Sequence, residues 1–328
     1  MRLNVVCPAF DEEGNVAELI RRLKPVLDGT GLDWEIIFVD DGSEDGTWQR
    51  LEQAAREDPR IRSLRLSRNF GHQVALTAGL EASDGDLVLT MDSDLQHPPE
   101  VIPALLARAR EGFDVVYAVP SSVAGESWLK RKSAQFFYRL LNRMTSLNLP
   151  RGGADFRLMS RRVVNAVLAM PEKHRFLRGM TRWVGFEQTV IEYDQPPRES
   201  GRSKYSLRRM WRFAWDAIAS FSALPLRAAS VFGFVVSGLG GLYLVYILAV
   251  YFFTDNAVAG WTSVVAAVLV LSGVQLICLG FIGQYLGRTY EEVKGRPLYL
   301  VADDTRGELP STSPTDEAES ERDTLSRL

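Results

Sequence analysis

The chain has 328 residues, a net charge of −3 and 46% hydrophobic residues. This length allows about two domains, and the average composition is that of an ordinary globular protein. The two cysteines, Cys7 and Cys278, are too few for a disulfide framework, and both are expected to be packing residues. No nucleic-acid motif is present, and the basic residues gather around two apolar runs rather than across a domain, so nucleic acid is not expected as a partner.

Short apolar runs rich in Val, Ile, Leu and Phe mark the first 120 residues. They cover residues 3–7, 34–39, 61–66, 86–91 and 113–119. Most are separated by helical patterns, and the first helix is expected at residues 12–27 because its apolar side chains recur at helical spacing. Strands that alternate with helices predict parallel βαβ units and an α/β fold.

Acidic and turn-forming residues follow three of these predicted strands, at residues 8–12, 39–43 and 92–94. Ligands of such sheets bind beyond the carboxyl ends of the strands, so these three segments are expected to converge on one site. The chain has neither a G-x-G-x-x-G sequence after its first strand nor a P-loop. A metal bridge is therefore the simplest predicted way to hold a diphosphate.

The segment Asp92-Ser93-Asp94 places two carboxylates one residue apart after an apolar strand. Hard Mg²⁺ or Mn²⁺ prefers oxygen ligands and keeps positions open for phosphate oxygens. Successive strand residues face opposite ways, so the chain must turn here for both carboxylates to reach one ion. The segment predicts a divalent cation and a nucleoside diphosphate; the alternative is a solvated turn.

Two amphipathic segments, at residues 128–144 and 207–224, carry an apolar stripe beside several Lys or Arg residues. Such helices lie in the membrane interface, with their basic groups near lipid phosphates. The alternative for each is a helix that packs on the soluble domain.

Two long runs, at residues 230–253 and 261–285, contain no charged residue, and each reaches the roughly 20 residues needed to span a bilayer. They predict a transmembrane hairpin over residues 228–287. Basic residues lie before the first run and after the second, and the first residues lack the apolar segment of a signal peptide. Both termini and the soluble domain are therefore expected on the cytoplasmic side of a bacterial-type inner (cell) membrane.

Small residues recur every four positions in these runs, at Gly233, Ser237 and Gly241 and at Gly283 and Gly287. They predict close helix contacts, within the hairpin or between subunits, and a homo-oligomer is expected. The domain boundaries predicted are 1–227 for the soluble domain, 288–302 for a cytosolic segment after the hairpin, and 303–328 for a disordered acidic tail.

Five segments in order, at residues 7–15, 39–47, 67–73, 91–100 and 201–207, resemble the inverting family 2 glycosyltransferases of GT-A (Rossmann-like) fold. With the C-terminal hairpin, this order is similar to the polyisoprenyl-phosphate glycosyltransferases, which include dolichyl-phosphate mannose synthase and bacterial undecaprenyl-phosphate glucosyl and aminoarabinosyl transferases. The resemblance implies transfer of one sugar from a nucleoside diphosphate sugar, with UDP-glucose mildly favoured, to a polyprenyl phosphate.

The resemblance also assigns roles to matching positions of this sequence. The donor would be held by Pro8, Phe10, Glu12, Val39, Asp41, Asp92 and Ser93, and the metal by Asp92, Asp94 and Gln96. Asp155 and Asp94 would be catalytic, Arg198 and Lys204 would reach phosphates, and Arg131 would contact the acceptor phosphate. An ion pair with Arg157 or a helix cap is the alternative for Asp155. Pro120 lies where relatives often carry an arginine, so the phosphate contacts are expected to be redistributed.

Two other functions compete with this interpretation. Processive polysaccharide synthases carry a Q-x-x-R-W sequence, but here Gly179 stands in place of the glutamine. A catalytically silent, nucleotide-binding membrane scaffold is the other alternative. The three histidines, His72, His97 and His174, lack metal-ligand spacing and are interpreted as structural or loop residues.

Overall fold

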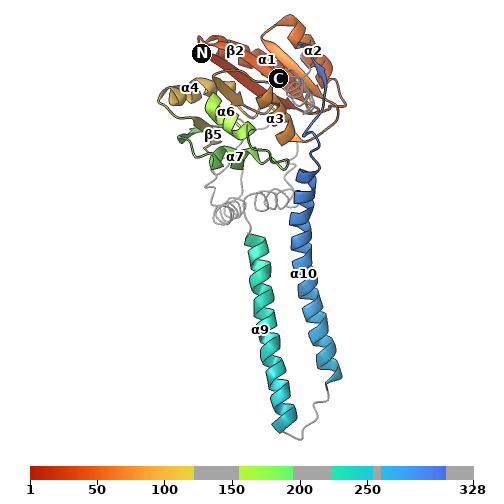
Figure 1. The fold of residues 1–328 in the computed structure, drawn as a ribbon. Coiled ribbons are helices and arrows are strands. Elements are labelled where there is room, and N and C mark those ends of the chain that lie inside the picture. Colours follow the sequence, from red (N-terminus) through yellow and green to blue (C-terminus); the bar gives the residue numbers. More distant parts are fainter. Residues whose placement is uncertain (122–154, 195–223, 254–259, 308–328) are drawn as a thin grey trace, which may run out of the picture. The chain divides into compact units, whose positions relative to one another are not determined.

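The structure is a computed structural model that describes residues 1–121, 155–194, 224–253 and 260–307 (Figure 1). The chain forms two compact units. The described part of the first unit comprises residues 1–121, 155–194 and 297–307, and that of the second comprises residues 224–253 and 260–296. The predicted interface helices, apart from Leu224, lie outside the described residues.

The first unit is built on an eight-stranded sheet in the order β7-β5-β6-β4-β1-β2-β3-β8. The strands are β1 (Arg2–Ala9), β2 (Asp33–Asp40), β3 (Ile61–Leu66), β4 (Leu87–Thr90), β5 (Val115–Pro120), β6 (Arg157–Ser160), β7 (Gln188–Tyr193) and β8 (Val301–Asp304). The five strands predicted from the sequence are confirmed to within two residues at each end.

The centre of the sheet is parallel, as the alternation of strands and helices predicts. β1 pairs in parallel with β2 and β4, and β2 pairs in parallel with β3. The carboxyl ends of these strands therefore lie at one edge of the sheet. The sheet as a whole is mixed, because β6 runs antiparallel between β4 and β5. β6 brings the residue just before it, Phe156, to this same edge.

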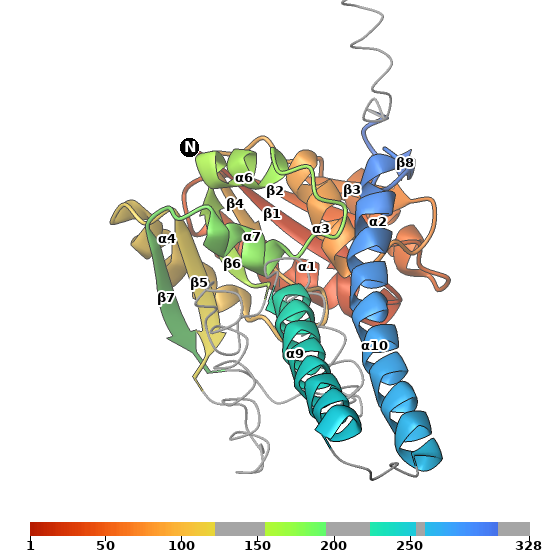
Figure 2. The same cartoon turned by 60° about the horizontal axis from the view of Figure 1, so that its bottom comes forward.

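Helices cover both faces of the sheet (Figures 1 and 2). One face packs on α1 (Glu13–Asp28), α2 (Thr47–Glu57) and α4 (Ile102–Arg110), which follows the short helix η1 (Pro99–Val101). The other packs on α3 (His72–Glu81) and α6 (Arg161–Leu168), with α7 (Leu177–Trp183) after them. The predicted first helix is thus confirmed, displaced by one residue.

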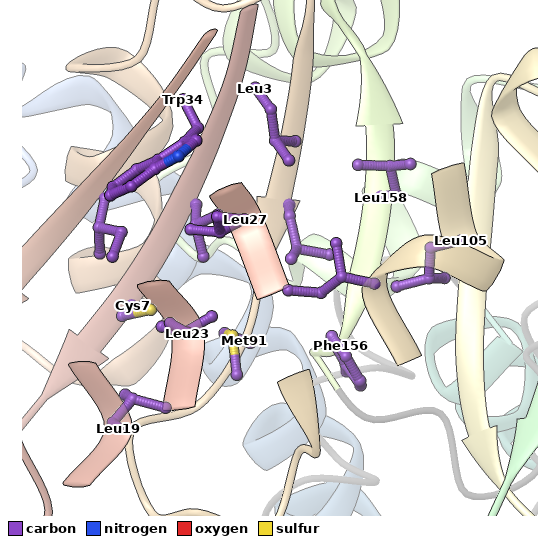
Figure 3. Packing of buried hydrophobic residues seen from close by; sticks show 14 of the residues in the cluster. Leu3, Cys7, Leu19, Leu23, Leu27, Trp34, Met91, Leu105, Phe156 and Leu158 are labelled. Carbon is purple, nitrogen blue, oxygen red and sulfur yellow. The ribbon is translucent and has the colours of Figure 1, made fainter. Parts of the chain in front are cut away.

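The core follows from the alternation of side chains along each strand. Leu3 and Cys7 of β1 join Leu19, Leu23 and Leu27 of α1 in one buried cluster (Figure 3). Each such leucine contributes about 1.5–3 kcal/mol through burial. On the opposite face, α3 lies so close that a Cβ atom at Gly79 would fall 2.3 Å from Cγ1 of Val6. Glycine is therefore required at this contact.

Strand β8 completes the sheet with residues from the end of the chain. It pairs antiparallel with β3, and Arg62 forms an ion pair with Asp304 at 2.7 Å. Thr305 exchanges two hydrogen bonds with the backbone of Ser63. The predicted boundary at residue 303 is therefore wrong, since Asp303 and Asp304 lie in a strand. The short, acidic β8 sequence lacks an apolar pattern, and its partners lie about 240 residues away in the sequence.

The second unit contains two helices, α9 (Leu224–Phe253) and α10 (Trp261–Val293). The Cys278 thiol lies 3.6 Å from the carbonyl oxygen of Ala229, so the helices contact each other. Large apolar side chains on both helices are exposed, among them Phe234 and Leu276. Among the residues that the structure describes, no helix combines the length and apolar character needed to cross a membrane. The two predicted spans stay predictions from the sequence.

Candidate active site

Asp155 lies two residues before β6, beside the end of β4. Its side chain is only 2% exposed, and its backbone carbonyl accepts a hydrogen bond from the Thr90 hydroxyl. Thr90 and Arg157 are register partners in the β4–β6 pair, so the antiparallel strand holds Asp155 at the carboxyl end of the central strands.

Both carboxylate oxygens of Asp155 accept several hydrogen bonds. Oδ1 accepts from Arg157 Nη2 at 3.3 Å and from Arg178 Nε at 3.1 Å. Oδ2 lies 3.0 Å from Arg178 Nη2, 3.0 Å from His72 Nε2 and 3.4 Å from Gln73 Nε2. Burial by itself raises the pKa of Asp155, but Arg178, the hydrogen bond with His72 and the charge of Arg157 together hold it well below its usual range. Asp155 is therefore an ionised carboxylate, and the ion pair with Arg157 considered from the sequence is present.

His72, the first residue of α3, connects Asp155 to the acidic turn after β4. Its Nε2 atom lies 3.0 Å from Asp155 Oδ2 and 3.5 Å from Asp92 Oδ1. Burial of the imidazole acts to lower its pKa, yet the hydrogen bond and charge of Asp155 and the charge of Asp92 raise the pKa above its ordinary value. The ring faces both carboxylates while 43% of the side-chain surface reaches solvent.

The turn at Asp92–Gln96 is held by its own hydrogen bonds. The Ser93 hydroxyl donates to the Pro8 carbonyl at 2.8 Å, and Gln96 donates to Asp94 from its backbone at 3.1 Å and its side chain at 2.6 Å. Leu95 has a φ of 61°, which is rare for a residue with a side chain. The chain thus turns sharply directly after the two carboxylates.

His97 holds the start of this turn through the backbone of Asp92. Its Nδ1 atom accepts a hydrogen bond from the Asp92 backbone at 2.9 Å, and its ring stacks on Phe156 with centroids 4.9 Å apart. His97 is 4% exposed, so its role is structural, in agreement with the sequence interpretation.

The turn creates a strongly negative environment. Burial raises the pKa of Glu12, the Asn15 side chain opposes this by donating a hydrogen bond, and the charges of Asp94, Asp45 and Asp92 raise it further. Burial also raises the pKa of Tyr193 to about 12, with added contributions from Asp92 and Asp94. The charges of the acidic turn therefore act on a group just beyond β1 and on the last residue of β7, and such a negative environment would favour a cation.

The ends of β1 and β2 form the neighbouring wall. Pro8 and Val39 are register partners, Val39 is buried, and the Phe10 ring is 43% exposed just beyond β1. The two oxygens of Asp41 accept hydrogen bonds from the backbones of Phe70 and Gly71, at 2.7 and 2.9 Å. Asp41 thereby fixes the loop that leads into α3 and His72.

The geometry brings together an acidic turn for a cation, an exposed aromatic ring, and a buried anion paired with Arg178. The profile of the family described as "Glycosyl transferase family 2" matches residues 4–168, half of the chain, which include these strand ends. The chain belongs to glycosyl transferase family 2. The enzyme prediction is thereby confirmed, and the α/β sheet with its strand-end site agrees with the GT-A fold expected from the resemblance.

This glycosyltransferase is similar to several bacterial proteins along nearly its whole length. It is 44% identical over 303 residues to the uncharacterized glycosyltransferase sll0501 of Synechocystis, covering 92% of this chain and 95% of that protein. It is 38% identical over 307 residues to the SfII prophage-derived bactoprenol glucosyl transferase of Shigella flexneri, covering 94% and 99%. A solved structure of glucosyl-3-phosphoglycerate synthase from Mycobacterium tuberculosis matches 67% of the chain with 19% identity and a TM-score of 0.47, covering 78% of that chain.

Most of the site residues predicted from the sequence lie at this edge of the glycosyltransferase sheet. They are Pro8, Phe10, Glu12, Val39, Asp41, Asp92, Ser93, Asp94, Gln96 and Asp155. Two of them also have structural contacts, since the Ser93 hydroxyl donates to the Pro8 carbonyl and Asp41 holds the loop at residues 70–71. Arg131, Arg198 and Lys204 lie outside the described residues.

Sequence reasoning missed three residues that contact Asp155. His72 was interpreted as structural, and Gln73 and Arg178 received no role, although Gln73 ends one of the five resembling segments. Gln73 also accepts a hydrogen bond from the backbone of Leu177 at 3.0 Å and so connects Asp155 to the start of α7. No local pattern marks Arg178 among the 38 Lys and Arg residues of the chain, because its partner lies 23 residues away.

Proposed function

We propose that this glycosyltransferase moves a single sugar from a nucleoside diphosphate sugar to a polyprenyl phosphate such as undecaprenyl phosphate, with inversion at the anomeric carbon. The observation that carries the proposal is the juxtaposition of the Asp92–Asp94 turn with ionised Asp155 through His72. A diphosphate held at the turn would place the attached sugar beside Asp155.

The acidic turn fits a divalent cation, Mg²⁺ or Mn²⁺. Asp92 Oδ1 is buried, accepts no hydrogen bond and lies 3.5 Å from His72 Nε2, so a cation bound beside it would offset the cost of burying this oxygen. Within the described parts of the chain, no three Asp, Glu, His or Cys side chains form a group able to hold a metal ion. Asp92 and Asp94 would therefore share the ion with the donor phosphates and the Gln96 side chain. A bound ion would offset negative charge on the leaving diphosphate.

The donor would lie along the ends of β1 and β2. The exposed ring of Phe10 offers a surface for a base, while Pro8 and Val39 form the wall next to it. Glu12 and Asp41 complete this side of the site. UDP-glucose is the favoured donor because the Shigella relative is named a glucosyl transferase.

The acceptor is proposed from the same relative, whose name states that it acts on bactoprenol, and from the chemistry of a lipid phosphate. The second pKa of a phosphate monoester is near 6, so the group is largely dianionic at neutral pH and is itself a nucleophile. Arg131, Arg198 and Lys204 are proposed to contact phosphates.

The reaction would be a single displacement. An acceptor phosphate oxygen forms the new bond to the anomeric carbon as the bond to the diphosphate oxygen breaks, and the nucleoside diphosphate leaves with the electron pair. The dianionic acceptor has no proton to lose, so Asp155 is not needed as a base. Asp155 would instead fix the groups around the reacting centre, in keeping with its lowered pKa.

The enzyme is proposed to work at the cytoplasmic face of the cell membrane, with two uncharged runs of its sequence in the bilayer. The uncharged runs at residues 230–253 and 261–285 support this proposal, as do the exposed apolar side chains of both helices. The repeated small residues of these runs support close helix packing and a homo-oligomer.

The test uses the full chain in membranes or detergent with Mg²⁺ or Mn²⁺, undecaprenyl phosphate and a panel of radiolabelled nucleotide sugars. We expect label from one donor in the organic phase, and its loss with a chelator. No lipid label from any donor, with folded protein and measurable nucleotide binding, would contradict the proposal and favour a silent scaffold. Label in a long polymer would favour a processive synthase.

A further inference from the structure

We infer that Arg178 binds the acceptor phosphate and that Asp155 and Gln73 position it for this contact. The inference rests on the proposed transfer to a polyprenyl phosphate and assigns a residue to its acceptor side. The Arg178 side chain comes from α7 and not from any of the strand-end segments proposed to hold the donor.

Arg178 is held in a fixed orientation. Its Nε and Nη2 atoms donate to the two oxygens of Asp155 at 3.1 and 3.0 Å, a two-point contact that fixes the plane of the guanidinium. Gln73 fixes the start of α7, because its side chain accepts from the Leu177 backbone and donates to Asp155. Leu177 is thus held by α3, and the guanidinium of Arg178 is held by Asp155 just before β6.

Arg178 nevertheless reaches solvent. Its side chain is 26% exposed, whereas Arg157, the other arginine on Asp155, is completely buried. Arg157 is thus enclosed by protein, and Arg178 is the one of these two arginines that an arriving anion can touch. Arginine suits this role because it stays charged at all working pH values and matches phosphate oxygens in geometry.

The order of contacts puts two residues between Arg178 and the diphosphate-binding turn, which favours the acceptor side for Arg178. It runs from Asp92 to His72, then to Asp155 and then to Arg178, so the diphosphate-binding turn and Arg178 are at its two ends. In a single displacement the nucleophile approaches from the side opposite the leaving group. A cation at the far end from Asp92 is therefore suited to the incoming phosphate.

The experiment compares Arg178→Gln with Arg162→Gln in the full chain. Arg162 is a matched control, since its Nε and Nη2 atoms make the same two-point contact with Asp114, a buried aspartate outside the site. The readouts are kcat and the separate KM values for undecaprenyl phosphate and for the donor. Binding of the uridine diphosphate donor product is measured in parallel.

We expect Arg178→Gln to raise the KM for undecaprenyl phosphate by about 10- to 100-fold, the loss of one charge-assisted phosphate contact, while donor KM and nucleotide binding change little. Arg178→Lys keeps the charge without the two-point geometry and should lie between Arg178→Gln and wild type. Arg162→Gln should keep both KM values. Gln73→Leu should raise the acceptor KM in the same direction.

An acceptor KM for Arg178→Gln within about twofold of wild type would overturn the inference. A fall in kcat alone would also overturn it, because Arg178 would then act only by positioning Asp155. If Arg178→Gln does not fold, Asp155→Asn is compared with the double variant Asp155→Asn/Arg178→Gln, because both lack the buried carboxylate charge of Asp155. A higher acceptor KM in the double variant supports the inference, and an equal acceptor KM overturns it. Failure of wild type to label undecaprenyl phosphate would instead contradict the proposed function.

Discussion

Asp155 and Arg178 face each other in a two-point ion pair, with Nε 3.1 Å from Oδ1 and Nη2 3.0 Å from Oδ2. Arg157, His72 and Gln73 complete the contacts of the same carboxylate. A carboxylate with this many donors is a poor proton acceptor, because its negative charge is already stabilised. The Asp155 carboxylate therefore positions the basic side chains around it.

The pH dependence of transfer should reflect the acceptor and not Asp155. The pKa of Asp155 is held well below its usual range, so the carboxylate stays ionised from pH 5 upward. The stability that it contributes is fully present above about pH 3.9, the ordinary pKa of an aspartate in the unfolded chain, and is lost as pH falls through the lower pKa of the folded state. We expect kcat/KM to rise with pH through about 6, where the acceptor phosphate loses its second proton. A profile of initial rates from pH 5 to 8 measures this. A phosphonate acceptor with a different second pKa should shift the limb, and an unshifted limb would assign it to the protein.

Asp94→Asn should lower transfer by at least about 100-fold, because the acidic turn loses one of two charges proposed to hold the cation, a loss of several kcal/mol. Titration calorimetry with UDP and Mn²⁺ should show weaker binding. Asp84→Asn is the control, since Asp84 is 63% exposed in a surface ion pair with Arg2 and its loss should change little. Equal rates for the two variants would show that Asp94 has no part in the site.

Asp41→Asn should weaken donor binding and destabilise the fold. An asparagine keeps one acceptor oxygen, so one of the backbone N–H groups of Phe70 and Gly71 would face an amide NH₂. We expect a loss of about 1–3 kcal/mol in the free energy of unfolding and a higher donor KM. Urea titration and donor kinetics measure the two effects, with exposed Asp33→Asn as the control. Unchanged stability would mean that Asp41 does not hold this loop.

Asp304→Ala should destabilise the first unit, because Arg62 would lose its carboxylate partner. The Asp304 side chain is fully buried and that of Arg62 is 10% exposed, and removal of one partner of such a pair costs about 3–5 kcal/mol. Thermal unfolding followed by circular dichroism checks this, with exposed Asp303→Ala as the control. A melting temperature equal to that of the control would show that β8 adds nothing to the sheet.

Local patterns were enough to predict the parallel centre of the fold and its binding edge. The apolar runs of β1 to β5 and the turn residues after β1, β2 and β4 are contiguous signals, so their place in an α/β sheet follows from the chain itself. The antiparallel strands β6 and β8 could not be found this way. β6 is four residues long, and β8 has one large apolar residue and two aspartates, so their pairing depends on distant partners.

The site likewise contains residues that a contiguous sequence pattern predicts and residues that only the fold brings together. Asp92, Asp94 and Asp155 are predicted as site residues because they lie in recognisable segments. His72 and Arg178 became visible only through the fold, since α3 and α7 bring them to Asp155 from 83 and 23 residues away. The partners of a buried carboxylate come from distant parts of the chain, so their spacing in the sequence does not predict the contact.

The most direct test of the account is the initial rate of sugar transfer to undecaprenyl phosphate by Asp155→Asn, compared with wild type and with Asp114→Asn. Asp114 is also a buried aspartate with a two-point arginine contact, so it controls for the loss of such a pair. The account predicts that Asp155→Asn loses at least about 100-fold in rate while UDP still binds, and that Asp114→Asn, once folded, transfers at nearly the wild-type rate. A rate for Asp155→Asn within twofold of the control would contradict the account, because the reacting centre would then lie elsewhere.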